Sequence, residues 1–157
     1  MSMLEGASER DKAIREVHGL SPLETALAKA YLQGCVYGWC KSKGTEPFRA
    51  QFFLGGDNYF WQSTPMFAVY SKRMAYYDGD WESASHQAAL DAGHLLKAVI
   101  KDDKRYFRTW TGEDGFRWYQ WDGNTDPNAE MRKEYNDYIL DAKRMLEPDK
   151  DSFQIPE

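Results

Sequence analysis

The chain has 157 residues, of which 42% are hydrophobic and 15% aromatic, and a formal net charge of −5. This length and composition predict one domain with a substantial core, and the acidic balance argues against a protein that coats nucleic acid through overall basic charge. No run of about 18 apolar residues occurs, and the N-terminus lacks the apolar block of a signal peptide, so we expect a cytoplasmic protein with no membrane partner.

Residues 1–20 are polar with mixed charge, and we expect them to form a mobile arm. A helix follows, predicted from Pro22 to about Ser42. Ser21 suits its N-cap, Pro22 its first position and Glu24 the third position of a capping box, because the Ser and Glu side chains then bond amides that a helix leaves unpaired. The start of this helix therefore has a strong local signal.

The same helix carries apolar residues along its whole length. Its first half has four of them at helical spacing: Leu23, Leu27, Ala30 and Tyr31. Its second half is apolar nearly all round, which predicts a central and closely packed element. Gly34 and Gly38 lie four residues apart there, and this spacing indicates a place where another element approaches the helix.

The middle of the chain is predicted to be helical with short connections. A short helix is expected over residues 47–54, and the glycines, Asp and Asn of residues 55–58 have the chemistry of a turn. A Ser-Thr-Pro sequence then opens a second helix over residues 63–77. A long helix with one broad apolar face follows over residues 81–101.

Residues 104–121 change to an alternating pattern, in which two aromatic segments flank Gly-Glu-Asp-Gly and predict a β-hairpin. With Thr111 opposite Phe116, one hairpin face holds Tyr106, Arg108, Trp110, Arg117, Tyr119 and Trp121. The other face holds Phe107, Thr109, Phe116 and Trp118. The first face could stack unpaired bases between arginines and rings, or its arginines could lie across the rings as internal cation–π pairs.

Residues 127–157 form an acidic C-terminal segment, with a helix predicted over residues 128–146. Four residues form its partner-binding stripe: Tyr135, Tyr138, Ile139 and Met145. Such a stripe either docks a protein partner or a second copy of the chain, giving a homodimer, or packs on its own domain.

The order of helix, short helix, turn, second helix, further helix and aromatic hairpin resembles the winged helix-turn-helix family over residues 22–121. The resemblance implies an α+β, mostly helical fold: a winged-helix-like domain of three or four helices plus a hairpin at residues 21–126, with the C-terminal helix added. In that family the helix after the turn enters the major groove of DNA and the wing contacts the backbone or minor groove. The extra long helix and the acidic hairpin tip depart from the family pattern.

The resemblance also implies a set of nucleic-acid-binding residues. On the groove helix and its start they are Gln62, Ser63, Thr64, Ser71, Lys72 and Arg73. On the wing they are Lys104, Arg105, Arg108 and Arg117. Their roles would be to contact base edges from the helix and phosphates from the wing.

Enzyme motifs are missing from the sequence. No phosphate loop, dinucleotide fingerprint or nucleophile elbow occurs. His86 and His94 are eight residues apart, which is too far for a compact metal pair on one helix. Cys35 and Cys40 are five apart on one predicted helix, so they favour neither a disulfide nor a metal site. We therefore predict a protein that is not an enzyme and holds no cofactor or metal.

Two functions are consistent with these patterns. The first is a DNA-binding regulator or accessory protein that uses the helix-turn-helix-like segment and the hairpin wing. The second is a protein-protein interaction module, such as an adaptor or an inhibitor of a partner protein, with an aromatic and acidic surface. Exposed basic residues on one face would favour the first function.

Overall fold

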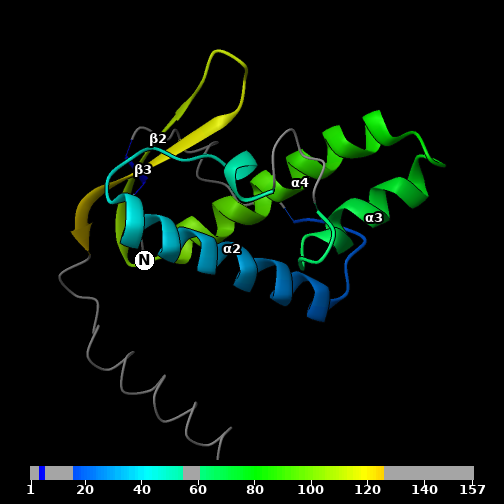
Figure 1. Cartoon of the computed structure of the whole chain (residues 1–157), viewed down its shortest axis with the longest axis horizontal. Helices are drawn as coiled ribbons and strands as arrows, with labels where there is room; N and C mark the ends of the chain where they lie inside the picture. The colour runs from blue at the N-terminus through cyan, green and yellow to red at the C-terminus, as the bar shows by residue number, and fades with distance from the viewer. Residues whose placement is uncertain (1–3, 6–15, 55–60, 126–157) are drawn as a thin grey trace, which may run out of the picture. The chain divides into compact units, whose positions relative to one another are not determined.

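The computed structural model describes residues 4–5, 16–54 and 61–125, and the chain divides into a unit of residues 1–126 and a unit of residues 127–157. The elements in chain order are β1 (Leu4–Glu5), α2 (Pro22–Lys43), the 3₁₀ turn η1 (Ala50–Phe53), α3 (Phe67–Tyr76), α4 (Trp81–Asp102), β2 (Arg105–Thr111) and β3 (Arg117–Thr125). The prediction of a mostly helical α+β fold with a β-hairpin is confirmed (Figure 1). The predicted turn at residues 55–58 and the predicted stripe of Tyr135, Tyr138, Ile139 and Met145 lie outside the described residues.

Helix α2 begins as its sequence predicts. The Ser21 hydroxyl accepts a hydrogen bond from the Glu24 amide at 3.0 Å, and the Glu24 carboxylate accepts one from the Ser21 amide at 2.9 Å. The helix ends at Gly44, whose φ of 61° is a conformation that glycine adopts at little cost. Local chemistry alone therefore sets both ends of this helix.

Helix α3 begins later than predicted. Residues 62–66 form turns, in which the Thr64 hydroxyl donates to the Trp61 carbonyl at 2.9 Å and accepts from the Met66 amide at 3.2 Å. Thr64 thus makes its hydrogen bonds in the turn that precedes the helix, and no side chain caps the first residues of α3. The predicted helix over residues 47–54 is likewise shorter, since only η1 forms there.

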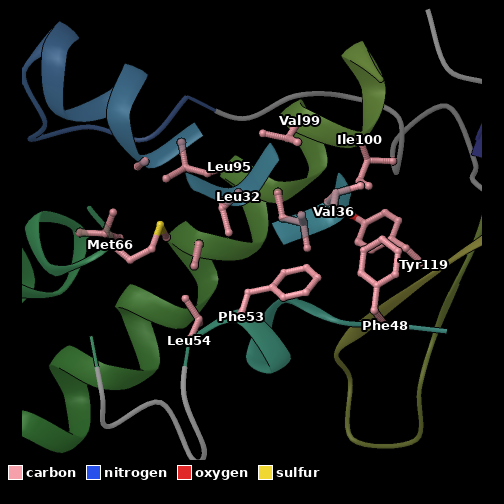
Figure 2. Close-up of a cluster of buried hydrophobic side chains, with 14 of the residues drawn as sticks. Leu32, Val36, Phe48, Phe53, Leu54, Met66, Leu95, Val99, Ile100 and Tyr119 are labelled. Atoms are coloured by element: carbon pink, nitrogen blue, oxygen red, sulfur yellow. The ribbon is translucent and has the colours of Figure 1, made fainter. Parts of the chain in front are cut away.

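The core lies between α2, α4, η1 and the hairpin. Helix α4 is buried along one broad face, as predicted, and both α2 and α3 pack against it (Figure 1). Phe48 and Tyr119 close the core toward the hairpin, with their rings stacked at a centroid distance of 5.9 Å (Figure 2). Phe48 also exchanges two backbone hydrogen bonds of 2.8 Å with Tyr119, so its segment adds a short bridge to β3.

The predicted hairpin register is wrong by one residue. Thr111 lies opposite Arg117, and Trp110 lies opposite Trp118. A slip of one residue moves every side chain of a strand to the other face. Arg117, Tyr119 and Trp121 therefore share the face of Phe107, which is the buried face, and the predicted row of alternating arginines and rings does not form.

Two parts of the predicted N-terminal arm are described. Strand β1 pairs in parallel with β2, with Leu4 opposite Phe107. Nearer to α2, Val17 and Leu20 are partly buried against the core. These contacts link residues 4–5 and 16–20 to the domain that follows.

Candidate functional site

The outer face of α2 is exposed although it is apolar. The buried side of the helix carries Ala28, Leu32, Val36 and Cys40. On the opposite side a second stripe at helical spacing is exposed, which we call the outer face: Leu23, Leu27, Ala30, Gly34, Tyr37, Gly38 and Lys41. Its three large apolar residues are well exposed, with 67% of Leu23, 49% of Leu27 and 53% of Tyr37 open to solvent. A contiguous apolar stripe of this kind is typical of an interaction surface.

The middle of the outer face is made of small residues. Ala30, Gly34 and Gly38 lie four residues apart, so they form one shallow strip along the helix. A Cβ atom added at Gly34 or at Gly38 would meet nothing within 4 Å. The prediction that another element of the domain approaches this glycine pair is therefore wrong for the described residues, and the strip is open to a second helix.

A hollow of about 500 Å³ continues the outer face at its C-terminal end. Its lining comes from α2 and from the base of the hairpin: Tyr37, Gly38, Cys40, Lys41, Arg105 and Trp121. The Arg105 guanidinium lies 5.0 Å from the centre of the Tyr37 ring and 5.6 Å from that of Trp121. The outer face thus has protruding leucines at one end and an aromatic hollow at the other.

Asp103 fixes the wall of this hollow. Its buried carboxylate accepts hydrogen bonds from the Gln33 amide group at 2.9 Å, the Arg105 backbone amide at 2.9 Å and the Arg105 guanidinium at 3.0 Å. A charged side chain held by both an ion pair and two rings has little freedom to turn outward. Arg105 is therefore placed as a structural wall of the hollow.

The thiol in the hollow is not activated. Burial raises the pKa of Cys40 to about 11, although the nearby Arg105 acts in the opposite direction. The neutral thiol consequently dominates at physiological pH, and a thiolate nucleophile is disfavoured. Within residues 4–5, 16–54 and 61–125, no three His, Cys, Asp or Glu side chains gather into a group that could hold a metal ion.

The two basic residues predicted for DNA on α3 point to α4 instead of solvent. The Arg73 guanidinium makes a two-pronged contact with the Asp91 carboxylate, at 2.8 and 3.0 Å, and the Lys72 ammonium lies 3.0 Å from the same carboxylate. Only 13% of the Lys72 side chain and 27% of the Arg73 side chain are exposed. Lys72 also donates to the His18 carbonyl. Both cations are thus held on one carboxylate inside the domain, with most of each side chain covered.

The remaining predicted nucleic-acid residues are spread over different parts of the surface. Gln62, Ser63 and Arg108 are exposed, whereas Thr64, Ser71, Lys104 and Arg117 are half-buried. Arg117 lies on the buried side of the hairpin because of the register, and Arg108 lies on the other side. Of the predicted set, the structure brings Lys72 and Arg73 together on Asp91 and places Arg108 and Arg117 on opposite faces of the hairpin.

Sequence reasoning missed two features. The exposure of Leu23 and Leu27 was missed because α2 is apolar on both sides, so periodicity alone does not say which side is buried. Arg49 was missed because its partner Asp114 is 65 residues away in the chain. An apolar stripe on each side of one helix is the signal that could have revealed the first.

None of the helices in the described part of the chain is both long enough and apolar enough to span a membrane. Comparisons with family models, with characterised proteins and with solved structures find no match to this chain. The function of the chain is therefore inferred from the geometry of the site.

Proposed function

We propose that this chain is a non-enzymatic protein-interaction module that docks a helix on the outer face of α2. The observation that carries the proposal is the exposed stripe of Leu23, Leu27 and Tyr37 around a strip of small residues. Small residues let two helix backbones approach closely, and flanking large residues then pack around the contact. From the order of its elements, we also propose that the body presenting this face is winged-helix-like.

The occupant that fits the face best is α2 of a second copy of the chain. A twofold axis between Ala30 and Gly34 would place two copies of α2 antiparallel, with Ala30 of each copy against Gly34 of the other. Leu27 would then pack against Tyr37 of the second copy. Such a contact is self-complementary, as a twofold interface must be.

Shape and charge at the two ends of the face support the same arrangement. In the antiparallel pair, the protruding Leu23 of each copy reaches the hollow beside Tyr37 and Lys41 of the other. Glu24 is exposed at the N-terminal end and Lys41 at the C-terminal end, so opposite charges meet twice. Rim charges of this kind mainly fix orientation, while the apolar centre supplies most of the affinity.

Sedimentation equilibrium of the full chain over a range of concentrations tests the proposal. We expect a monomer–dimer equilibrium that Leu27→Glu weakens roughly tenfold or more, because the new carboxylate would be buried without a partner. Leu90→Glu is the matched control, since Leu90 is an exposed leucine of α4 (41% exposed) away from the outer face. A wild-type chain that stays monomeric at its highest soluble concentration would overturn the second copy as occupant.

A second variant separates loss of association from loss of folding. Gly34→Leu adds a side chain into open space, and replacing a mid-helix glycine gains up to about 1 kcal/mol of helix stability. We expect a chain that is at least as stable as the wild type and yet monomeric, because the added side chain keeps the two helices apart. A dimer that survives this change contradicts the proposed contact.

DNA binding, the other function predicted from the sequence, has its own test. Electrophoretic retardation of random duplex and single-stranded DNA, at low and moderate salt, measures the phosphate contacts directly. Retardation that Arg108→Gln and Lys104→Gln weaken would favour the DNA-binding function over the interaction module. Absence of retardation even at low salt would contradict the hypothesis that the chain binds DNA.

A further inference from the structure

Arg49 holds the tip of the hairpin against η1. One nitrogen of its guanidinium, Nη1, donates to the Asp114 carboxylate at 2.7 Å, and Nη2 donates to the Gln51 side chain. The guanidinium also lies over two rings, 4.9 Å from the centre of Phe116 and 5.1 Å from that of Trp118. Only 12% of the Arg49 side chain is exposed, so this cation is nearly buried.

One donor of this buried arginine is unsatisfied. Its Nε–H has no hydrogen-bond partner, and among the described residues the only other buried side-chain atom in this condition is the hydroxyl oxygen of Ser85. Leaving a buried donor unpaired costs about 1–3 kcal/mol, and more when the group is charged. An acceptor that entered beside Arg49 would remove this cost.

Open space lies beside Arg49, between α4 and the hairpin tip, although the Nε atom itself is closed to solvent and is reached only if the side chain shifts. A cavity of about 40 Å³ is lined by Arg49 and Gln51, and an adjoining one of about 180 Å³ opens outward along α4. Both cavities share part of their lining: Ala89, Gly93, Phe116, Arg117 and Tyr119. A Cβ atom at Gly93 would meet nothing within 4 Å, so the missing side chain leaves this space open.

The lining of these cavities is cationic around an apolar floor. Arg117, Lys97 and His94 line the outer cavity, and Arg49 lines the inner one. Three permanent positive charges thus surround the space, while the Asp114 carboxylate bonds Nη1 of Arg49 from the loop. Arginine is the residue best suited to phosphate oxygens, because its planar N–H groups match their geometry.

We infer that this cavity between α4 and the hairpin tip binds the phosphate group of a phosphate monoester, and that a small shift of the Arg49 side chain brings its Nε–H to the phosphate as the inner donor. Arg117 and Lys97 would contact the outer oxygens, and the apolar floor of Ala89, Gly93 and Phe116 would cover the group that carries the phosphate. The space is smaller than the roughly 300 Å³ of a pocket for a drug-sized ligand. It therefore suits a phosphorylated side chain or a small phosphate ester, and it does not depend on the proposed α2 interface.

Nuclear magnetic resonance of the full chain reads out the proposed donor itself. In a ¹H–¹⁵N spectrum that covers arginine side chains, we expect the Arg49 Nε–H signal to shift in a saturable way as inorganic phosphate is added. Chloride at matched ionic strength is the control. A signal that does not move with phosphate, or that moves equally with chloride, overturns the inference and leaves bound water as the acceptor.

Two variants tie the binding to the cavity. Arg117→Gln removes an outer cation, and we expect it to weaken phosphate binding roughly tenfold, as a charged hydrogen bond of about 1.5–3 kcal/mol predicts. Arg108→Gln removes the same charge from the exposed, opposite side of the hairpin and is expected to leave binding within about twofold. Equal losses of phosphate affinity in the two variants would mean that only the net charge of the protein matters, and would overturn the proposed site.

Two further ligands distinguish a small phosphate ester from a phosphorylated protein as the natural ligand. Phenyl phosphate represents a free phosphate ester, and a peptide with one phosphotyrosine represents a modified protein. Tighter binding of the peptide would assign the site to a phosphorylated partner, and equal binding would assign it to a small ester. Failure of both, together with inorganic phosphate, overturns the inference without affecting the α2 interface.

Discussion

Helix α3 and the hairpin both pack on the rest of the domain, but different interactions hold them. Of the helical residues of α3, Val69 alone is buried, and the helix is tied to α4 by the Asp91 carboxylate with Arg73 and Lys72. The hairpin instead buries Phe107 and Tyr119, whose rings lie 6.0 and 5.9 Å from the ring of Phe48. The α3 contact thus includes a buried ion cluster beside its apolar residues, whereas the hairpin contact is mainly aromatic.

This difference predicts how each contact responds to its surroundings. Burial of rings stabilises a contact through surface removed from water, so it depends little on pH. A buried ion pair depends on every partner being present and charged, since a lone buried charge is costly. Acid should therefore loosen α3 from α4 before it loosens the hairpin.

The largest expected effect is at the aromatic contact. Tyr119→Ala removes a ring that is 97% buried and stacked on Phe48, and large-to-small changes of this kind cost about 3–5 kcal/mol. Trp110→Ala, on the exposed side of the same hairpin, should cost about 1 kcal/mol. Urea denaturation of the two variants measures both values. Similar losses would mean that the hairpin does not bury one face in preference to the other.

The ionic contact should respond nearly as strongly to loss of its carboxylate. Asp91→Ala removes the carboxylate that Arg73 and Lys72 share, and breaking a buried pair costs about 3 kcal/mol. Asp102→Ala, at the exposed end of the same helix, is the control and should stay within about 0.5 kcal/mol of the wild type. A loss below about 1 kcal/mol in Asp91→Ala would show that the cluster contributes little.

A smaller effect of pH follows from the same cluster. Burial acts to raise the pKa of Asp91, but hydrogen bonds from Arg73 and Lys72 outweigh it and hold the pKa below its ordinary value. The unfolded chain, with an Asp pKa of about 3.9, then takes up the proton first as the pH falls. The contribution is fully present above about pH 5 and is lost as the pH drops below about 4 toward the folded-state pKa.

Urea denaturation at a series of pH values checks this expectation. The difference in unfolding free energy between the wild type and Asp91→Asn should be constant above about pH 5 and should narrow below about pH 4. Tyr119→Ala supplies the contrast, because its difference from the wild type should not narrow in the same range. A constant difference for both variants would contradict the ionic account of the α3 contact.

The fold could be predicted where local chemistry decides it. The capping residues of α2 and the long apolar face of α4 gave the helices to within a few residues. The hairpin register could not be predicted, because tryptophans stand on both faces and either register places rings on each side. In the observed register, the Gly112 amide closes the hairpin loop by donating to the Phe116 carbonyl at 2.8 Å. The five-residue loop between Thr111 and Arg117 leaves the choice of register to contacts with Phe48 and the core.

The candidate sites were harder to predict than the fold. The DNA-binding prediction requires the basic residues of α3 to be exposed, yet Asp91, 18 residues after Arg73, holds both of them against α4. Likewise the exposed side of α2 depends on where α4 packs, and α4 is separate in sequence. Residue type and spacing identify which residues are chemically capable of binding, but tertiary packing decides which of them remain accessible.

The smallest effect on stability is expected at the hairpin tip. Asp114 has 48% of its side chain exposed, and a hydrogen bond from Arg49 lowers its pKa. Arg49 is nearly buried, but asparagine keeps a side-chain oxygen that can accept its hydrogen bond, and a half-exposed carboxylate adds little charge stabilisation, so Asp114→Asn should change the urea midpoint only slightly. The same change removes the negative charge that competes for Arg49, and the phosphate titration should therefore show tighter binding. A lower midpoint would instead show that Asp114 stabilises the loop as Asp91 stabilises α3. The hairpin contact would then depend on an ion pair as well, like the α3 contact.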